Sequence, residues 1–166
     1  MTVAEAAAPA AIVMTIRRAT LADVPVIVAL MADDHNGAAR EDPSLPLDAR
    51  YEHGFAAIDT DLNQELVVAE TAGRIVGTLQ LTFIPGLSFR GALRGQIESV
   101  RIASDLRGHG LGKQLIDWAV DRCRARGCRF VQLTSQTNRT AAHRFYQRLG
   151  WDQSHLGFKL HFGDNG

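Results

Sequence analysis

The sequence predicts a mixed α+β fold in which helices flank a sheet. Runs that alternate polar and apolar residues and carry β-branched side chains, such as residues 96–102, are typical of half-buried strands. Other stretches repeat apolar residues at helical spacing, as between Leu111 and Val120. Both kinds of run are distributed along the whole chain, and neither an internal repeat nor a linker divides it. We therefore expect residues 12–166 to form a single domain.

The N-terminal half is expected to contain a strand, two helices and a hairpin. A strand over residues 12–18 leads to a helix that Thr20 caps and that continues to about residue 31, with Pro25 tolerated in its first turns. Residues 33–46 are polar and turn-rich, which indicates a loop. The next elements are a helix at about 48–58, hairpin strands at 65–70 and 74–83, and a strand that ends at 102.

The C-terminal half alternates helices and strands. A helix begins near residue 111 and ends before Gly127, a strand covers residues 130–134, and a further helix ends at Gly150, a residue suited to the left-handed conformation that closes helices. Residues 155–162 alternate polar and apolar side chains and predict a terminal strand. The alanine-rich residues 1–11 are expected to be a disordered tail.

Composition argues against several classes of function. The chain has 18 Lys and Arg against 18 Asp and Glu, and this balance does not support nucleic-acid binding. No apolar run is long enough to span a bilayer, so no membrane partner is expected. The six histidines are scattered and Cys123 and Cys128 lack zinc spacing, so we expect no metal. The absence of a disulfide framework fits the cytoplasm.

Three glycines lie between a predicted strand and a predicted helix, in residues 107–112, RGHGLG. Glycines let a backbone approach a ligand closely, and the first turn of a helix offers unpaired N–H groups to an anion. A nucleotide P-loop does not fit, because Arg107 replaces its first glycine and Gln114 its hydroxyl residue. A dinucleotide fingerprint does not fit either, because the spacing is G-x-G-x-G and no clear ribose carboxylate follows. The pattern [Q/R]-x-x-G-x-[G/A] does fit.

This last pattern resembles the acyl-CoA pyrophosphate loop of the GNAT N-acetyltransferase superfamily. Residues 142–151, AHRFYQRLGW, resemble the family's A-x-x-[F/L]-Y-x-x-x-G-[F/Y/W] segment. The two motifs stand in the family's order with a strand between them, and the resemblance covers nearly the whole chain after residue 12. It implies a predominantly antiparallel central sheet flanked by helices, acetyl-CoA as cosubstrate, and transfer of the acetyl group to a primary amine.

Acetyl transfer needs a base, because an amine with a pKa of about 10.4 is mostly protonated near pH 7, and an acid assists the leaving thiolate. Glu98 is the expected base, directly or through water, because its strand leads into the glycine loop and the family carries a carboxylate there. Alternation would place Glu98 on one side with Gln96, Val100 and Ile102; alternatively, Glu98 is an exposed carboxylate paired with a nearby arginine. The resemblance implies that Tyr146 is the acid, although a tyrosine bonded to buried backbone would give the same sequence.

The resemblance also implies the contacts to acetyl-CoA. The backbone at the strand end would pair with the pantetheine arm and stabilise the oxyanion, while the glycine loop would hold the pyrophosphate. The family often has Asn seven positions before the tyrosine, where this chain has Arg139 after Asn138. The expected cosubstrate-binding residues are Val100, Arg101, Ile102, Arg107, Gly108, His109, Gly110, Leu111, Gly112, Lys113, Asn138 and Arg139.

The sequence defines the acceptor-binding side of the site less sharply than the side that binds acetyl-CoA. In this fold the acceptor-binding side is built from the first helices, their loop and the last hairpin, and acidic residues there would attract an ammonium group unless they are simply solvated. Residues 142–146 and 153–155 locally resemble the aminoalkylphosphonate N-acetyltransferase branch, which leaves a small primary amine as the expected substrate. The expected acceptor-binding residues are Asp34, His35, Tyr51, Phe83 and His155.

Two further functions stay open at this level. The chain could be a catalytically weak regulator or sensor that binds acyl-CoA, or it could acetylate proteins or peptides, which requires an open groove. The presence of both Glu98 and Tyr146 favours the small-molecule N-acetyltransferase. The apolar terminal strand would suit the edge of a homodimer.

Overall fold

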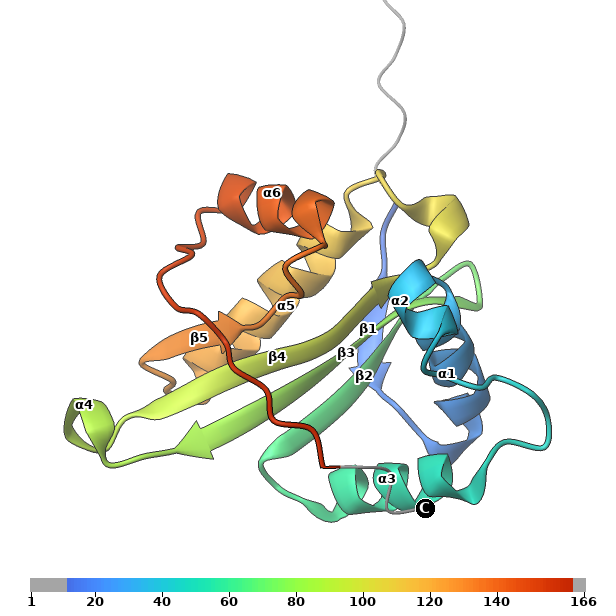
Figure 1. Ribbon diagram of the computed structural model, residues 1–166, viewed down its shortest axis with the longest axis horizontal. Coiled ribbons are helices and arrows are strands. Elements are labelled where there is room, and N and C mark those ends of the chain that lie inside the picture. Colours follow the sequence, from blue (N-terminus) through green and yellow to red (C-terminus); the bar gives the residue numbers. More distant parts are fainter. Residues whose placement is uncertain (1–11, 163–166) are drawn as a thin grey trace, which may run out of the picture. The chain divides into compact units, whose positions relative to one another are not determined.

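The computed structural model describes residues 12–162 (Figure 1). The tail expected over residues 1–11 lies outside the described residues. The chain falls into two compact units, one that extends through Gln132 and one that begins at Leu133, and each is described by itself.

The first unit is built on a predominantly antiparallel sheet. Strands β1 (Thr15–Arg18), β2 (Gln64–Thr71), β3 (Arg74–Pro85) and β4 (Leu93–Ile102) pair in sequence order, each antiparallel to the next, and β5 (Phe130–Leu133) follows β4 in the sheet. The predicted hairpin joins β2 to β3 through Ala72 and Gly73, which both have positive φ. The sheet and its flanking helices confirm the predicted fold class.

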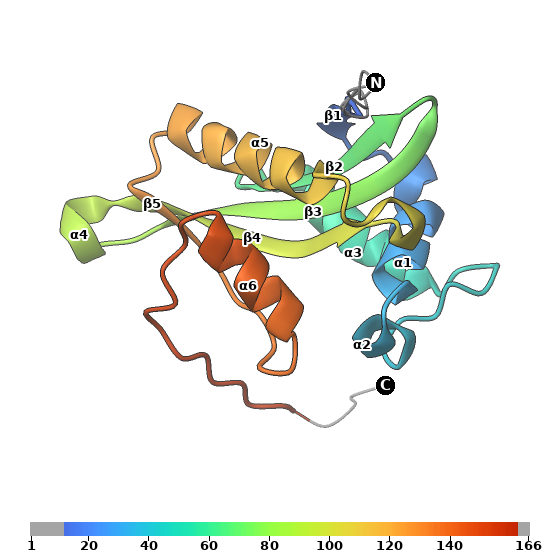
Figure 2. The same cartoon turned by 90° about the horizontal axis from the view of Figure 1, so that it is seen from above.

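Helices cover both faces of this sheet (Figure 2). On one face lie α1 (Val24–Ala32), which follows the 3₁₀ turn η1 (Leu21–Asp23), and α3 (Ala49–Thr60). There Leu66 and Val68 of β2 pack in one cluster with Ile27 and Phe55. As predicted, Thr20 precedes the first helical turn, and its backbone N–H donates to Asp23 Oδ2 at 2.7 Å.

Helix α5 (Leu111–Ala125) covers the opposite face of the sheet (Figure 2). Its apolar stripe is buried, as the helical spacing predicts, and consists of Leu111, Leu115, Ile116, Ala119 and Cys123. Gly95 of β4 lies beneath this stripe, where a methyl group would overlap Cys123 Sγ. The predicted helix end is also confirmed, since Gly127 has a φ of 76° just beyond it.

Three short segments in the first unit differ from expectation. β1 begins at Thr15 rather than at residue 12. The expected loop over residues 33–46 contains a short helix, α2 (His35–Ala38), because the Asp34 side chain caps it by accepting from the Gly37 N–H at 2.6 Å. The connection between β3 and β4 likewise contains a single turn, α4 (Ser88–Gly91).

The second unit contains α6 (Thr140–Arg148), which ends before Gly150 as predicted, and that glycine has a φ of 83°. The terminal strand predicted over residues 155–162 is wrong, because residues 151–162 contain neither helix nor strand. Alternation describes only the side chains, whereas a strand also needs a neighbour for its N–H and C=O groups.

Candidate active site

A β-bulge interrupts β4 beside Glu98. Gln80 pairs with Glu98 and Thr78 with Arg101, so Ser99 and Val100 together face a single residue of β3. Ser99 occupies the left-handed region with a φ of 53°. The extra residue inverts the alternation, and the expectation that Val100 and Ile102 lie on the same side as Glu98 is therefore wrong: Arg101 does instead.

Glu98 lies on the sheet face that α1 and α3 cover. Its partner Gln80 is also opposite Leu66 of β2, which belongs to the cluster beneath those helices. The Glu98 side chain is exposed. Its carboxylate is thus accessible to water and to a substrate on the face where the acceptor is expected.

The Arg101 side chain points from this face towards α2. Its Nε lies 3.6 Å from Asp34 Oδ2, and both side chains are largely buried, at 9% and 17% exposure. Its Nη1 donates to the Val100 carbonyl at 2.9 Å. Asp34, expected at the acceptor site, is therefore paired with Arg101 while it also caps α2.

The glycine loop leads from the end of β4, through η2 (Ser104–Leu106), to the start of α5. Gly108 and Gly110 have φ values of 83° and 81°, and the space around both is open. Gly110 is the N-cap of α5 and has no side chain to accept a hydrogen bond. The N–H groups of the first turn, from Leu111 to Lys113, thus have no partner within the helix and carry the positive end of its dipole. This loop can hold an anionic group such as a diphosphate.

The side chains of the loop contact other parts of the protein. His109 Nδ1 lies 3.0 Å from the Arg107 carbonyl, and the Lys113 ammonium pairs with Asp117 at 2.5 Å on exposed α5 surface. Arg107 donates to the Ile102 carbonyl at 3.0 Å and pairs with Asp33 at 3.2 Å. Backbone groups therefore supply the most direct means of binding a ligand here.

Tyr146, Asn138 and Arg139 belong to the second unit. Tyr146 lies on α6 with its ring centroid 5.1 Å from that of Phe145 and 5.8 Å from that of Trp151. Its carbonyl accepts from the Trp151 N–H at 3.1 Å. Arg139 is the N-cap residue of α6, directly after Asn138. An aromatic cluster thus fixes Tyr146 within its unit.

Of the remaining acceptor candidates, Tyr51 links α3 to the preceding loop. Its hydroxyl accepts from the Asp42 N–H at 3.0 Å and donates to Glu41 Oε2 at 3.1 Å. Burial, with the Glu41 carboxylate, raises the pKa of Tyr51. His35 is the first residue of α2, and its side chain lies outside the described part. In the second unit, His155 Nδ1 lies 2.7 Å from Ser154 Oγ.

Phe83 does not lie where an acceptor would reach it. Its side chain is only 1% exposed and packs under Arg126, the C-cap residue that follows α5, whose guanidinium carbon is 4.4 Å from the ring centroid. Phe83 alternates with Leu79 and Leu81 on the face opposite Glu98. The alternation of these apolar residues with Thr78, Gln80 and Thr82 is the sequence signal that identifies Phe83 as a core residue.

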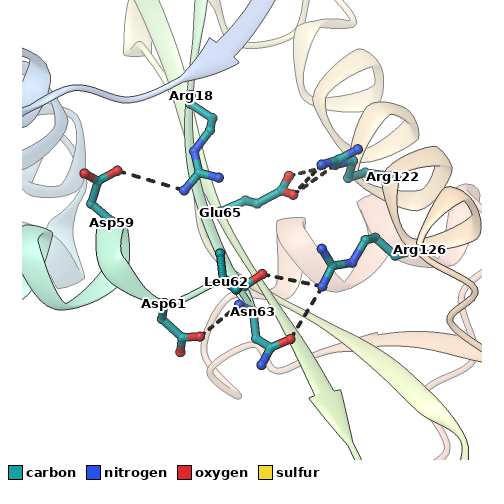
Figure 3. Close-up of a pocket in the computed structure, with 8 residues that line it drawn as sticks. All are labelled: Arg18, Asp59, Asp61, Leu62, Asn63, Glu65, Arg122 and Arg126. Carbon is teal, nitrogen blue, oxygen red and sulfur yellow. Dashed lines mark hydrogen bonds and ion pairs between the residues drawn. The ribbon is translucent and has the colours of Figure 1, made fainter.

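A cavity of about 590 Å³ lies far from the glycine loop. Arg122, in the last turn of α5, and Arg126, its C-cap residue, line this cavity about 20 Å from the first turn at 1.5 Å per residue. Figure 3 shows that its charges are largely paired within the protein; Arg122, for example, binds Glu65 at 2.7 Å. Its lining consists of Arg18, Asp59, Asp61, Leu62, Asn63, Glu65, Arg122 and Arg126.

Within residues 12–162 the structure contains neither a candidate metal site nor a membrane-spanning helix. No group of three His, Cys, Asp or Glu side chains in this range could hold a metal ion. No helix in the same range combines the length and the apolar character needed to cross a membrane.

Sequence reasoning missed the bulge at Ser99, because serine has no marked preference for positive φ. The signal that could have found it is the adjacent polar pair Glu98 and Ser99, after which the apolar positions continue one residue out of phase. Sequence reasoning also missed that the Arg107 side chain contacts Asp33. Only the fold brings these two residues, which are 74 positions apart, together.

A bulged strand, a glycine loop and a helix without a capping side chain thus follow one another along the chain. Comparison with known proteins identifies the family. Residues 28–151 match the Acetyltransferase (GNAT) family, and the chain therefore belongs to it. It is accordingly an N-acetyltransferase of the family that uses acetyl-CoA.

Among curated relatives, the aminoalkylphosphonate N-acetyltransferase of Salmonella typhimurium is 33% identical over 108 residues, which are 65% of this chain and 70% of the relative. The L-methionine sulfoximine/L-methionine sulfone acetyltransferase of Pseudomonas aeruginosa is 29% identical and aligns over 84% of this chain and 81% of its own. A crystal structure described as a transcriptional regulator from Bacillus halodurans C-125 superimposes with a TM-score of 0.88 at 45% identity, over 90% of this chain and 100% of that one.

Proposed function

We propose that the protein transfers the acetyl group of acetyl-CoA to the primary amine of a small molecule. One observation carries the proposal: Glu98, the bulge at Ser99 and the open glycine loop follow one another along β4 and into α5. A carboxylate that can take a proton and a loop that can hold a diphosphate thus belong to one continuous stretch of chain. We also propose that residues 12–166 act as one catalytic domain.

In the proposed reaction Glu98 accepts a proton from the substrate ammonium, directly or through a water molecule. The freed nitrogen lone pair attacks the thioester carbon, a C–N bond forms, and backbone N–H groups at the end of β4 stabilise the oxyanion. The C–S bond then breaks as the nitrogen loses its second proton to water, which leaves a neutral amide, and the Tyr146 hydroxyl gives its proton to the thiolate. Solvent reprotonates the tyrosinate, while Glu98 releases its proton.

The loop suits the diphosphate of acetyl-CoA because Gly108 and Gly110 leave room for it and the first turn of α5 offers N–H groups. We propose that the backbone from Val100 to Ile102 receives the pantetheine arm. Asn138 and Arg139, at the start of α6, are proposed to contact the nucleotide end.

A small amine is proposed as the acceptor because two curated relatives are named for acetylating small compounds, an aminoalkylphosphonate and a methionine derivative. Tyr51, His35 and His155 remain the proposed contacts. Asp34 is proposed to contact the acceptor together with Arg101, since the Asp34 carboxylate is already paired with that arginine.

A thiol-release assay with acetyl-CoA tests the proposal. The panel comprises amino acids, aminophosphonates, polyamines, aminoglycosides and a short peptide, with Tyr146→Phe as the variant. We expect turnover with at least one small amine, and a kcat for Tyr146→Phe that is lower by about 10- to 100-fold at unchanged acetyl-CoA affinity. Preference for the peptide would instead identify a peptide N-acetyltransferase.

A second candidate is a regulator that binds acyl-CoA without efficient turnover. The description of the Bacillus halodurans structure as a transcriptional regulator favours it. Tight acetyl-CoA binding in calorimetry without thiol release for any amine would identify this function and contradict the enzymatic proposal.

We further propose that the protein is a homodimer in the cytoplasm. Leu156, Phe158, Leu160 and Phe162 are each at least 80% exposed and alternate along one extended segment, which suits pairing with a second copy. Cys123 and Cys128 are free thiols, as a reducing compartment maintains them.

A further inference from the structure

Asp33 connects the end of α1 to the segment that begins the glycine loop. Its Oδ2 accepts from the Ser104 backbone N–H at 2.9 Å and from Arg107 Nη2 at 3.2 Å. The Asp33 carbonyl accepts from the same Nη2 at 2.5 Å. The end of α1 is therefore bonded to the loop through both a side chain and the backbone.

Arg107 also bonds to the end of β4. Its Nε donates to the carbonyl of Ile102, the last residue of β4, at 3.0 Å. One guanidinium thus joins three segments: the end of α1, the end of β4 and the first residue of the glycine loop. Because its Nε and Nη2 are engaged with protein oxygens, they are not aimed at a phosphate, although arginine often binds phosphate through its planar fork.

Exposure limits what the charges alone contribute. The side chains of Asp33 and Arg107 are 38% and 46% exposed, and ion pairs at such sites add little to stability. The geometry of the contacts matters more, because three of the four bonds involve backbone groups and so fix the path of the chain. Residues 107–110 are otherwise exposed. Two of them, Gly108 and Gly110, are glycines, which by themselves allow the loop backbone many conformations.

We propose that Asp33 is a positioning residue for acetyl-CoA: through Arg107 and Ser104 it holds the glycine loop in the conformation that receives the diphosphate. This inference rests on the proposed function of that loop. It assigns Arg107 an indirect role, in which its guanidinium shapes the loop and backbone N–H groups bind the ligand. It also makes the cosubstrate loop depend on α1, which lies on the acceptor face.

The test is the binding of acetyl-CoA, measured by isothermal titration calorimetry, to Asp33→Asn, Arg107→Ala and the double variant. Losing bonds in a partly exposed network is expected to raise the Kd of each single variant about 3- to 10-fold. Because the Asp33 carboxylate and the Arg107 guanidinium belong to one bonded network, the two losses should be less than additive, and the double variant should bind about as weakly as Arg107→Ala. In steady-state assays KM for acetyl-CoA should rise, while kcat at saturation stays within about twofold.

Asp105→Asn is the matched control. Asp105 lies in the same segment and pairs with Arg74 through two bonds of 2.7 and 3.0 Å, but it does not contact Arg107 in any described bond. Its Kd should equal that of the wild type. Thermal unfolding of every variant separates loop positioning from a general loss of folding. Asp33→Glu is a conservative replacement and is expected to recover part of the affinity.

The outcomes distinguish the two proposals. Wild-type binding together with an unchanged Kd for Asp33→Asn, or fully additive losses in the double variant, would overturn the positioning role alone. A wild-type protein that does not bind acetyl-CoA would overturn the proposed function and this inference with it.

Discussion

Glu98 is the side chain whose replacement tests the chemistry most directly. It is exposed opposite Gln80, on the face covered by α1 and α3. Glu98→Gln preserves the size of the side chain but cannot accept a proton. We expect kcat/KM for the amine to fall about 10²- to 10⁴-fold, the usual contribution of a positioned base, with acetyl-CoA affinity unchanged. Thiol-release kinetics and calorimetry measure the two quantities.

Asp121→Asn serves as the control for this change, because Asp121 is an exposed carboxylate of α5 that pairs only with Arg124 in the described contacts. It should retain wild-type kinetics. If Glu98→Gln kept more than half of the activity, another group would have to remove the proton.

Asp23 carries a pH-dependent share of the stability. Arg17 donates to it at 2.7 and 3.0 Å, and Thr20 adds two further bonds; these contacts hold the pKa of Asp23 down at about 2. Because the folded pKa lies below the unfolded value near 3.8, the stabilisation is present above about pH 4. It is lost as the pH falls from about 4 through 2.

We therefore expect Asp23→Asn to lower the free energy of unfolding by about 1–2 kcal/mol at pH 7, a figure reduced because Arg17 is partly exposed. The difference from the wild type should shrink towards pH 2. Urea unfolding at pH 7, 4 and 2.5 measures it, and a difference independent of pH would show that the charge of Asp23 is not the cause.

At the scale of elements, the contact between β4 and α5 depends on Gly95. A methyl group there would overlap Cys123 Sγ, whose surroundings are so apolar that burial raises the pKa of that thiol to about 12. We expect Gly95→Ala to destabilise the fold by about 1–3 kcal/mol through overpacking. Gly54→Ala in α3 is the control: nothing lies within 4 Å of its added methyl, so it should be neutral or slightly stabilising in denaturant unfolding.

Elements with strong local signals were predictable. The apolar stripe of α5, its closing Gly127, and the hairpin turn at Gly73 each follow from residues that favour one local structure. The site was predictable only in part. Counting alternate residues along β4 failed beyond Ser99, because a bulge shifts the count by one, and its mark in the sequence is only the adjacent polar pair Glu98 and Ser99. The role of Glu98 as the base stays a prediction.

Other elements depend on contacts that a local pattern does not contain. α2 forms because Asp34 caps it and also pairs with Arg101, more than sixty residues away. Residues 155–162 have the side-chain pattern of a strand, but whether a strand forms depends on a neighbouring edge.

At the scale of the whole molecule, the exposed apolar side chains of residues 156–162 predict that the protein forms an oligomer. Phe158 is 95% exposed, and burying side chains of this size contributes about 1.5–3 kcal/mol each. We expect sedimentation velocity to show a dimer for the wild type and a monomer for Phe158→Asp. Leu87→Asp, at an equally exposed apolar residue in the connection between β3 and β4, should remain dimeric. A monomeric wild type at micromolar concentration would contradict the prediction.

The absence of a capping side chain at Gly110, the N-cap of α5, has a thermodynamic consequence. Gly110 offers no oxygen to the first turn, so a bound diphosphate would serve as the cap that the sequence omits. Ligand binding and helix stability then become one equilibrium: the amides of Leu111 to Lys113 should exchange hydrogen rapidly in the free protein and slowly with acetyl-CoA present. The melting temperature should rise with the logarithm of the acetyl-CoA concentration, since the ligand binds the first turn of α5 only when the protein is folded.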